Sequence, residues 1–524
     1  MKKRFLVALL AMLVVTVGAF SEKITILHLN DTHGHAWPYF SYPMPNIGGF
    51  AAIATKVKEI KKENPNTLFL HAGDINTGMP ESDLLNAKPD IEALNMMGLN
   101  AVAIGNHEFD HTRDVLKKQM KWADFPFLSC NIFKKGDILP YFQPYTTMKV
   151  GNLKVAVIGV TTQSTEEIGN PKHVGDLDFR DPIQYVKRYK ALLERTYNPD
   201  LIIVLSHLGY FTDKREKYAG SRQLAQAVSG IVIVDGHTHT ELDKPVEVNG
   251  SIIVQASSWG KFLGRLDLDI ENKKIVSYNG KLIKINFKKR EKYYVEKDGK
   301  KIKKYKYYPI GDVIPEDKAV KDMLDKYKAE AGKGLNKPIG ETKILLSHGT
   351  AETKDNLLAE IITDSIKDFT KADIALQNGG GIRADINPGK ISYRDVLTVL
   401  PFGNTVFKMN MTGKEVMAVL NYAAGLPETI GAHLHTAGLT WTNNKGKVEN
   451  VKVNGEALEL NKMYSVAAND YMANGGDGYK TLTVGQNRMD TGYVLADLVA
   501  DYIKKIKLID GDNYKLEVRN TIIK

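Results

Sequence analysis

The chain has 524 residues, which exceeds the roughly 250–300 residues at which a single hydrophobic core stops growing, so we expect at least two domains. A hydrophobic content of 43% and a charged content of 25% are ordinary for globular proteins and exclude a disordered or fibrous chain. The formal net charge of +10 would suit a binder of nucleic acid or membranes if it were spread evenly, but residues 281–308 alone hold twelve Lys or Arg against three Asp or Glu.

The first residues, MKKRFLVALLAMLVVTVGAFSEK, have the pattern of a secretory signal peptide. A basic start is followed by an apolar run over residues 5–17 and by small residues up to Ala19, so we expect cleavage there and a leader over residues 1–19. A membrane anchor is the alternative, but the run is shorter than the ~20 residues that a span needs, and no second such run follows. We therefore expect an exported protein, periplasmic or secreted, with no membrane anchor in the mature chain.

Six short runs rich in β-branched residues predict strands in the first half of the chain. In order they read ITILHL, TLFLHAGD, AVAIGNHEFD, KVAVIGVTT, LIIVLSHLG and IVIVDGHTHT. Helical patterns over residues 49–63 and 182–196 lie between some of them, and the strands are apolar on both faces. Strands and helices that alternate in this way predict an α/β fold with largely buried sheets.

Side chains of the metal-binding types follow five of these predicted strands. They are Asp31 and His33, then Asp74, then Asn106 and His107, then His207, and finally His237 and His239. Loops at the carboxyl ends of strands in an α/β sheet converge on one place, so these side chains can meet. A single His in such a loop is more often a hydrogen-bonded residue than a ligand, but the ordered set indicates a metal site.

In the basic segment 281–308, the residue pattern alternates on both sides of Asp298 and Gly299, a pair typical of tight turns. This pattern predicts an exposed hairpin with its lysines facing solvent. A solvated ribbon is the favoured interpretation and a patch that attracts anions stays open, and no nucleic-acid partner is expected. A polar amphipathic helix over residues 315–332 then predicts a connector, and a second unit begins near Ile339. We expect an N-terminal domain over residues 22–312, a connector helix within residues 313–338 and a C-terminal domain over residues 339–524.

The motifs DTH, GD, GNHEFD, SHLG and GHTH, in this order, resemble those of the calcineurin-like metallophosphoesterases. NGGGIRADI, LPFGNTVFKMNMTGKEV and NDYMANGGDGY resemble the second domain of the 5'-nucleotidase family, which includes periplasmic UDP-sugar hydrolases and ecto-5'-nucleotidases. The resemblance covers residues 23–509. It implies a four-layer αββα N-terminal domain, an α/β substrate-binding C-terminal domain, and closure of the two around the substrate with a hinge at the connector helix.

The resemblance also implies a dinuclear-metal phosphohydrolase that releases phosphate from nucleoside 5'-monophosphates, with UDP-sugars and nucleoside di- and triphosphates as further candidate substrates. Two divalent ions lower the pKa of a shared water and hold the attacking and leaving oxygens at phosphorus. Mixed nitrogen and oxygen ligands suit Mn, Zn, Co or Fe, and the choice among them stays open. The alternatives are a 2',3'-cyclic nucleotide 2'-phosphodiesterase with 3'-nucleotidase activity, a catalytically inactive nucleotide-binding or adhesion protein, and a binder of anionic polymers. Oligomeric state and base preference stay open.

Roles for single residues follow from the same resemblance. One ion would be held by Asp31, His33, Asp74 and His239, and the other by Asp74, Asn106, His207 and His237. His107 would be the catalytic histidine with Asp110 as its partner, and the substrate-binding residues would be Asn378, Arg383, Phe402, Asn404, Tyr471 and Asp477. His35 has the same strand parity as Asp31 and His33, but the ligand set is complete without it. Residues 341–360 lack the arginine that relatives carry there, and Lys343, His348 and Lys354 are the candidates to replace it in the phosphate clamp.

Overall fold

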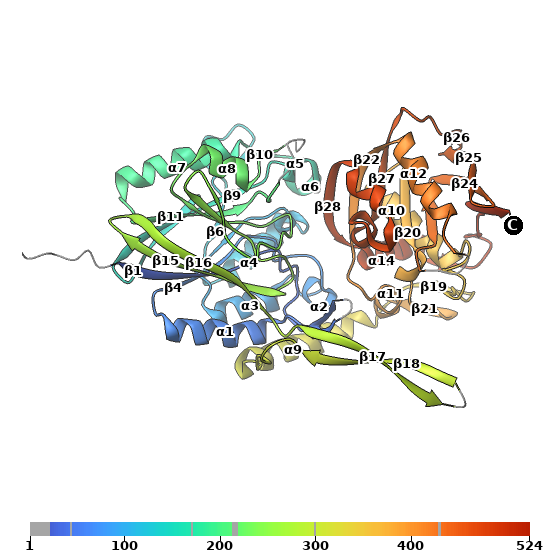
Figure 1. Cartoon of the computed structure of the whole chain (residues 1–524), viewed down its shortest axis with the longest axis horizontal. Helices are drawn as coiled ribbons and strands as arrows, with labels where there is room; N and C mark the ends of the chain where they lie inside the picture. The colour runs from blue at the N-terminus through green and yellow to red at the C-terminus, as the bar shows by residue number, and fades with distance from the viewer. Residues whose placement is uncertain are drawn as a thin grey trace, which may run out of the picture.

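The computed structural model of the chain, drawn in Figure 1, describes residues 21–41, 44–168, 171–211, 218–297, 300–427 and 431–523. The expected leader over residues 1–19 lies outside this part of the chain. Two α/β domains follow one another along the sequence, and a long hairpin projects beside them (Figure 1).

Two six-stranded sheets face each other in the N-terminal domain. The first sheet has the order β16 (Lys274–Lys284), β15 (Phe262–Glu271), β1 (Glu22–Leu29), β4 (Thr67–His71), β5 (Ala101–Ala103) and β6 (Phe127–Leu128). The second has the order β13 (Val246–Val248), β14 (Ser251–Val254), β12 (Val232–Val234), β11 (Leu201–His207), β9 (Leu153–Thr161) and β8 (Tyr145–Val150). The strands β1, β4, β5 and β6 run parallel, as do β9, β11, β12 and β14, so the loops after them open at one edge of each sheet.

Apolar side chains fill the space between the sheets and also the space outside them. Ile24 of β1 and Val157 of β9 lie in the core between the sheets. On the outer face of the first sheet, Leu27 belongs to a core formed with α1 (Phe50–Glu63), α3 (Lys88–Met97) and α4 (Arg113–Trp122). On the outer face of the second, Val204 belongs to a core formed with α7 (Pro182–Thr196) and α8 (Ser221–Ala227). The four-layer αββα arrangement is therefore confirmed.

Local signals in the sequence set the starts of the outer helices. The Asp181 carboxylate accepts hydrogen bonds from the backbone N–H groups of Ile183 and Gln184, and Pro182 occupies the first turn of α7. Both features favour a helix start, because they satisfy or remove N–H groups that have no partner within the helix. Shorter elements join the larger ones: β2 (Tyr39–Ser41), β3 (Met44–Ile47), α2 (Pro80–Asp83), η1 (His107–Phe109), β7 (Ile132–Lys134), α5 (Thr165–Ile168), α6 (Pro171–Val174) and β10 (Leu177–Phe179).

The helix expected to connect the domains is α9 (Lys318–Leu335), and it packs on the N-terminal domain. Val320 and Leu324 belong to the same core as α1 and α3, and the indole N–H of Trp37 donates to the Leu324 carbonyl at 3.1 Å. The helix is thus part of the outer layer of the first domain. The chain enters the second domain after it, through Asn336 and Lys337.

The C-terminal domain is built on a five-stranded sheet of order β23 (Leu434–Ala437), β20 (Ile374–Asn378), β27 (Met463–Asn469), β22 (Thr405–Thr412) and β28 (Gln486–Val494). One face packs against α10 (Leu357–Thr370), α11 (Tyr393–Val399) and α14 (Leu495–Ile506), and the other against α12 (Gly413–Ala424) and α13 (Asp470–Ala473). Two smaller sheets complete the domain. One has the order β21 (Gly389–Ser392), β19 (Pro338–Thr342) and β29 (Leu508–Ile509). The other has the order β26 (Glu456–Ala457), β25 (Lys447–Val453), β24 (Leu439–Asn444) and β30 (Asn520–Ile523). Short 3-10 turns are η2 (Gly379–Gly381), η3 (Gly476–Gly478) and η4 (Lys480–Val484).

The predicted basic hairpin is present as β17 (Lys288–Lys297) and β18 (Lys300–Pro309). The two strands pair antiparallel with each other and form a two-stranded sheet. Figure 1 shows this ribbon extending away from both domains, next to the start of α9.

Candidate metal centre

The loops that follow β1, β4, β5, β11 and β12 meet at one place and bring all seven predicted metal ligands together. Three overlapping groups have ligand atoms within 4.8 Å of one another: Asp31 with His33 and His239, His33 with Asp74 and His107, and Asp74 with His207 and His237. Asn106 joins them, because its Oδ1 lies 3.1 Å from His207 Nε2 and 2.9 Å from His237 Nδ1. Parallel strands of two different sheets thus supply one cluster.

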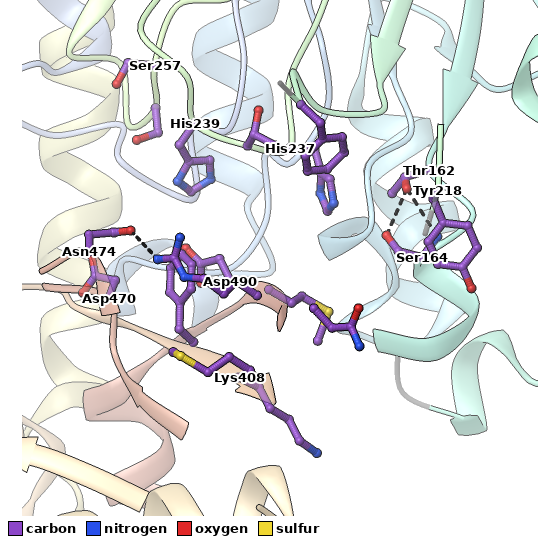
Figure 2. A pocket seen from close by; sticks show the side chains of 18 of the residues that line it. Thr162, Ser164, Tyr218, His237, His239, Ser257, Lys408, Asp470, Asn474 and Asp490 are labelled. Atoms are coloured by element: carbon purple, nitrogen blue, oxygen red, sulfur yellow. Dashed lines mark hydrogen bonds between the residues drawn. The ribbon is translucent and has the colours of Figure 1, made fainter. Parts of the chain in front are cut away.

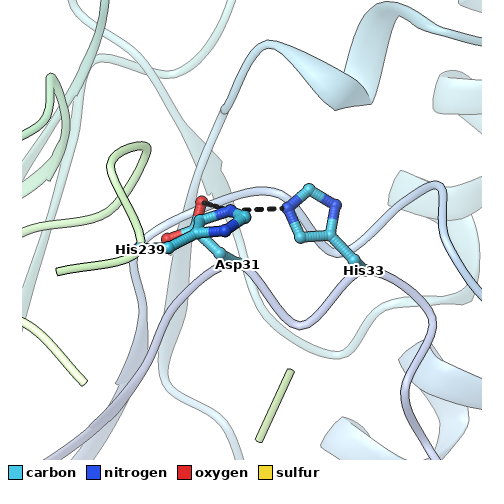
Figure 3. Close-up of side chains that lie close together, drawn as sticks. All are labelled: Asp31, His33 and His239. Atoms are coloured by element: carbon cyan, nitrogen blue, oxygen red, sulfur yellow. Dashed lines mark hydrogen bonds and ion pairs between the residues drawn. The ribbon is translucent and has the colours of Figure 1, made fainter. Parts of the chain in front are cut away.

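Asp74 lies between the two halves of the cluster. Its Oδ2 is 3.0 Å from His207 Nε2 and 3.9 Å from His33 Nε2. In the half shown in Figure 3, His33 Nε2 is 3.1 Å from His239 Nε2, and His239 Nε2 is 3.5 Å from Asp31 Oδ1. One carboxylate oxygen therefore faces both ligand groups.

The backbone at the cluster is strained. Asp31, Asp74 and His237 have φ values of 50°, 58° and 78°, and His33 and His239 have φ values of 45° and 53°. Residues other than glycine rarely adopt this left-handed region, and they persist there where the surrounding structure enforces it. Here the neighbouring loops do so: the N–H of Asp31 donates to the Gly73 carbonyl at 2.9 Å, and that of His33 to the Asp74 carbonyl at 3.1 Å.

Two histidines of the cluster, His33 and His207, direct Nε2 into the cluster and Nδ1 away from it, toward backbone carbonyl oxygens. His33 Nδ1 lies 3.0 Å from the carbonyl oxygens of Asn76 and Thr77, and His207 Nδ1 lies 2.7 Å from that of Ala72. A carbonyl only accepts, so each Nδ1 carries a proton and each Nε2 faces the cluster, where it can turn a lone pair to a cation. Burial opposes a charge on His207, but without an ion the Asp74 carboxylate, 3.0 Å from His207 Nε2, raises the pKa of His207 to about 10, so a cation would have to displace a proton there. Burial lowers the pKa of His33 to about 3, which keeps its lone pair free. Neutral imidazoles, carboxylates and one amide oxygen are the donor set of borderline divalent metals.

His107 lies beside the predicted ligands His33 and Asp74, but its side chain is hydrogen-bonded to a carboxylate outside that set. Its Nδ1 lies 2.5 Å from Asp110 Oδ2, which also accepts a hydrogen bond from the Thr77 hydroxyl at 2.5 Å. Burial opposes a charge on this ring, but the carboxylates of Asp110 and Asp74 raise the pKa of His107 to about 10. The ring is therefore a cation whose Nε2–H is not used by Asp110.

Glu108 is a member of the site to which the sequence assigned no role. Its carboxylate accepts from the backbone N–H groups of Asp74 at 3.0 Å, Ile75 at 2.9 Å and Gly105 at 2.7 Å. It thereby joins the loop after β4 to the loop after β5, which carry Asp74 and Asn106. Burial and the nearby Asp74 carboxylate raise the pKa of Glu108 to about 7. Its place inside the GNHEFD motif, next to two site residues, is the signal that could have indicated it.

His35 lies outside the cluster, as the sequence predicted. Its ring stacks on Trp259 with centroids 4.9 Å apart, and its Nδ1 donates to the His33 carbonyl at 2.7 Å. Through this hydrogen bond His35 contacts the backbone of the loop that carries Asp31 and His33.

A cavity of about 670 Å³ lies between the domains and reaches the cluster (Figure 2). From the N-terminal domain, His237, His239, Ser257, Trp259 and Lys261 line it. From the C-terminal domain, its lining includes residues of β22, α13 and β28 and the residue that follows α13: Lys408, Asp470, Arg488, Asp490 and Asn474. The backbone of β28 also covers His107, because a methyl group placed on Gly492 would lie 1.6 Å from His107 Nε2.

The six predicted substrate-binding residues lie elsewhere on the C-terminal domain, and none of them is among the described residues that line this cavity. Three form one group, in which Asp477 accepts hydrogen bonds from the Asn378 amide at 2.8 Å and the Tyr471 hydroxyl at 2.9 Å. The Arg383 guanidinium lies 5.8 Å from the centre of the Phe402 ring. The Asn404 amide donates to Asp470 at 2.6 Å, and Asp470 does line the cavity.

The two halves of the chain match two known domain families. Residues 24–241 match the calcineurin-like phosphoesterase family, and residues 338–484 match the 5'-nucleotidase C-terminal domain. A 5'-nucleotidase of Vibrio vulnificus is 37% identical over 522 residues, which cover 94% of this chain and 92% of that protein. Protein UshA of Escherichia coli is 37% identical over 523 residues, covering 94% and 93%.

Solved structures agree with these sequence matches. The crystal structure of a 5'-nucleotidase precursor from Thermus thermophilus is 30% identical, with a TM-score of 0.56 and coverage of 96% of this chain and 99% of that one. The NAD nucleotidase of Haemophilus influenzae shares the fold, with a TM-score of 0.76 at 24% identity and coverage of 96% and 100%. The chain therefore belongs to the 5'-nucleotidase family, with a calcineurin-like phosphoesterase domain followed by a 5'-nucleotidase C-terminal domain.

Proposed function

We propose that this protein is a metal-dependent phosphohydrolase that releases phosphate from nucleoside 5'-monophosphates. The observation that carries the proposal is the place of Asp74 Oδ2, between His207 Nε2 at 3.0 Å and His33 Nε2 at 3.9 Å. One carboxylate oxygen that faces two ligand groups suits a pair of divalent ions. Asp31, His33, Asp74 and His239 would hold one ion, and Asp74, Asn106, His207 and His237 the other. When bound, the ions supply a nucleophile at neutral pH and positive charge for the phosphate oxygens.

His107 would act on the substrate and not on an ion. Asp110 fixes the ring through Nδ1 at 2.5 Å, so the protonated Nε2 can donate to a phosphate oxygen or to the leaving oxygen. The Thr77 hydroxyl donates to the same Asp110 oxygen, which holds the carboxylate in place. Asp110 and Thr77 are therefore positioning residues.

The C-terminal domain would bind the nucleoside. In this proposal Phe402 and Tyr471 enclose the base and Asp477 accepts from the ribose hydroxyls, while Arg383 and Asn378 contact phosphate and Asn404 the base. The contacts among Asn378, Tyr471 and Asp477 support a prearranged site, because Asp477 already accepts from both neighbours. These residues do not line the cavity at the metal centre, so the C-terminal domain has to turn to bring them to it. Since α9 belongs to the first domain, we place the hinge at Asn336 and Lys337.

The proposal includes export, which rests on the signal-peptide pattern of the first residues. Within the residues that the structure describes, the helices are all too short or too polar to cross a bilayer.

One assay tests the activity. Phosphate release is measured from AMP, UDP-glucose and 2',3'-cyclic AMP, each with added Mn²⁺ and with a chelator. The proposal expects release from AMP that the chelator abolishes and Mn²⁺ restores. Turnover of 2',3'-cyclic AMP without turnover of AMP would replace it with the cyclic phosphodiesterase. A folded protein that binds Mn²⁺ but releases phosphate from none of the three would refute it.

A further inference from the structure

The ribbon formed by β17 and β18, called the basic ribbon below, carries a large excess of positive charge. Its 22 residues from Lys288 to Pro309 include ten Lys or Arg and three Asp or Glu. The strands pair with each other, and Figure 1 shows the ribbon extending clear of both domains. Among the ribbon residues that the structure describes, none belongs to the metal cluster or lines the cavity at it. The proposed phosphohydrolase therefore gives these charges no role.

The register of the two strands places one cation opposite one tyrosine in five of its ten rows. Side chains alternate between the two faces, so every second row shares a face. On one face Arg290 lies opposite Tyr307, Lys292 opposite Tyr305 and Tyr294 opposite Lys303, in three successive rows. On the other face Lys289 lies opposite Tyr308 and Tyr293 opposite Lys304, with the row of Glu291 and Lys306 between them. Successive rows on a face are about 7 Å apart, which is two residues of an antiparallel strand.

The tyrosine rings stay at the surface. Tyr294 is 58% exposed and Tyr308 is 44% exposed, and Tyr305 and Tyr307 are partly exposed as well. Cations lie over two rings, with the Arg290 guanidinium 4.5 Å from the centre of Tyr305 and Lys306 Nζ 5.3 Å from that of Tyr293. Glu291 pairs with Lys289 at 2.9 Å and offsets one charge only. The ribbon thus presents aromatic faces together with a large excess of positive charge.

We propose that the basic ribbon binds single-stranded nucleic acid. The repeating unit of such a strand is one phosphate and one base, and three successive rows on one face of the ribbon each offer one cation and one aromatic ring. Cations that neutralise phosphates and rings that stack on bases are the two recurring contacts of proteins that bind single strands. An anionic membrane also attracts lysine, but a fluid lipid surface has no repeat that the three successive rows of cation and ring would match. In a duplex the base faces are stacked on each other and closed to the rings. This surface is separate from the proposed substrate site and goes beyond the proposed function.

The test measures fluorescence anisotropy of a labelled 20-nucleotide oligo(dT) with hydroxyl groups at both ends, titrated with the whole protein in the presence of Mn²⁺. The oligonucleotide is recovered and checked for length, so that binding is not confused with cleavage. We expect the logarithm of the association constant to fall with the logarithm of KCl concentration with a slope between about −2 and −4, as for three to six phosphate contacts on a single strand.

Two ribbon variants separate the charges from the rings. The variant Lys289→Gln, Arg290→Gln, Lys292→Gln, Lys304→Gln is expected to bind about tenfold or more weakly and to lower the steepness of the salt dependence by about 2. The variant Tyr305→Leu, Tyr307→Leu, Tyr308→Leu is expected to bind about tenfold or more weakly with the slope unchanged, because stacking is lost and charge is kept. The matched control Lys187→Gln, Lys190→Gln, Lys318→Gln, Lys321→Gln removes the same charge from α7 and α9 and should bind like the parent.

Several outcomes would overturn the proposal. These are no binding of oligo(dT), equal loss in the control and ribbon variants, tighter binding of a duplex of the same length, or binding of anionic phosphatidylglycerol vesicles without binding of the oligonucleotide. Displacement of the oligonucleotide by AMP would also overturn it, since it would place the strand in the cleft. AMP hydrolysis by each variant at the parent rate shows that a loss of binding is not a loss of folding, and if the parent proves inactive on AMP, an unchanged melting temperature replaces that readout.

Discussion

Replacement of Glu108 by Gln tests whether this buried carboxylate positions the two loops that carry Asp74 and Asn106 relative to each other. Oε2 accepts from the N–H groups of Asp74 and Gly105 at 3.0 and 2.7 Å, and Oε1 accepts from that of Ile75 at 2.9 Å. Glutamine turns an NH₂ group toward at least one of these donors and removes the negative charge from the others. A hydrogen bond to a charged group contributes about 1.5–3 kcal/mol, so we expect the free energy of unfolding of the metal-free protein to fall by about that amount.

The expected functional result is a loss of metal affinity by about 10- to 100-fold, because residues that orient ligands tune affinity on that scale. Mn²⁺ affinity is measured by competition with a chelating dye, and the unfolding free energy by urea titration without metal. The control is Glu59→Gln, which removes an exposed carboxylate of α1 that pairs with Lys56. An Mn²⁺ affinity within twofold of the parent, in a variant that is measurably less stable, would refute a role for Glu108 in positioning the ligands.

Three further changes test the rest of the site. Asp74→Ala removes the oxygen that lies 3.0 Å from His207 Nε2 and 3.9 Å from His33 Nε2, so both activity and tight Mn²⁺ binding should disappear. A calorimetric titration that still finds two tightly bound ions would contradict a role for Asp74 as the shared ligand. His107→Ala should keep the Mn²⁺ affinity and lower kcat by about 10²–10⁴-fold, as for the loss of an acid group, and a matched loss of metal would instead make His107 a ligand. Gly492 has a φ of 69°, and Gly492→Ala places a methyl group 1.6 Å from His107 Nε2. The two domains should therefore move apart, and small-angle X-ray scattering measures this change. Gly455→Ala has a similar φ of 89° with no atom within 4 Å of the added methyl, so it controls for backbone strain and should scatter like the parent.

The strands and the meeting of the candidate metal ligands at one place could be predicted because both leave local marks in the sequence. Apolar runs such as ITILHL give buried strands, and in a parallel sheet the residue that follows each strand has to lie at the same edge, so Asp31, Asp74 and Asn106 meet without any knowledge of the packing. The expected helix over residues 182–196 is found as α7 (Pro182–Thr196), because a capping Asp and a Pro in the first turn mark its start.

Features that depend on contacts between distant elements could not be read in the same way. The amphipathic pattern of residues 315–332 indicates a helix, but not that Val320 and Leu324 join the core of the first domain. Glu108 looks like a surface residue of a polar loop, and only the approach of the β4 loop gives its carboxylate three backbone donors. The six proposed substrate-binding residues are not among the described residues that line the cavity at the candidate metal centre, and nothing in their motifs indicates how the two domains are oriented.

The contact between β28 and His107 relates catalysis to that orientation. In the proposed mechanism, a phosphate that accepts a hydrogen bond from His107 Nε2 would occupy the space that Gly492 closes, so β28 would have to move before substrate reacts. This strand is hydrogen-bonded to β22 and continues directly into α14, which packs on α10, so it moves only with the C-terminal domain as a body. Under the same proposal, the rotation that clears His107 would also bring Arg383, Phe402 and Tyr471 toward the candidate metal centre, whereas α9, which packs in the first domain, would stay in place. Release of the catalytic histidine and delivery of the nucleotide would then be one movement about Asn336 and Lys337.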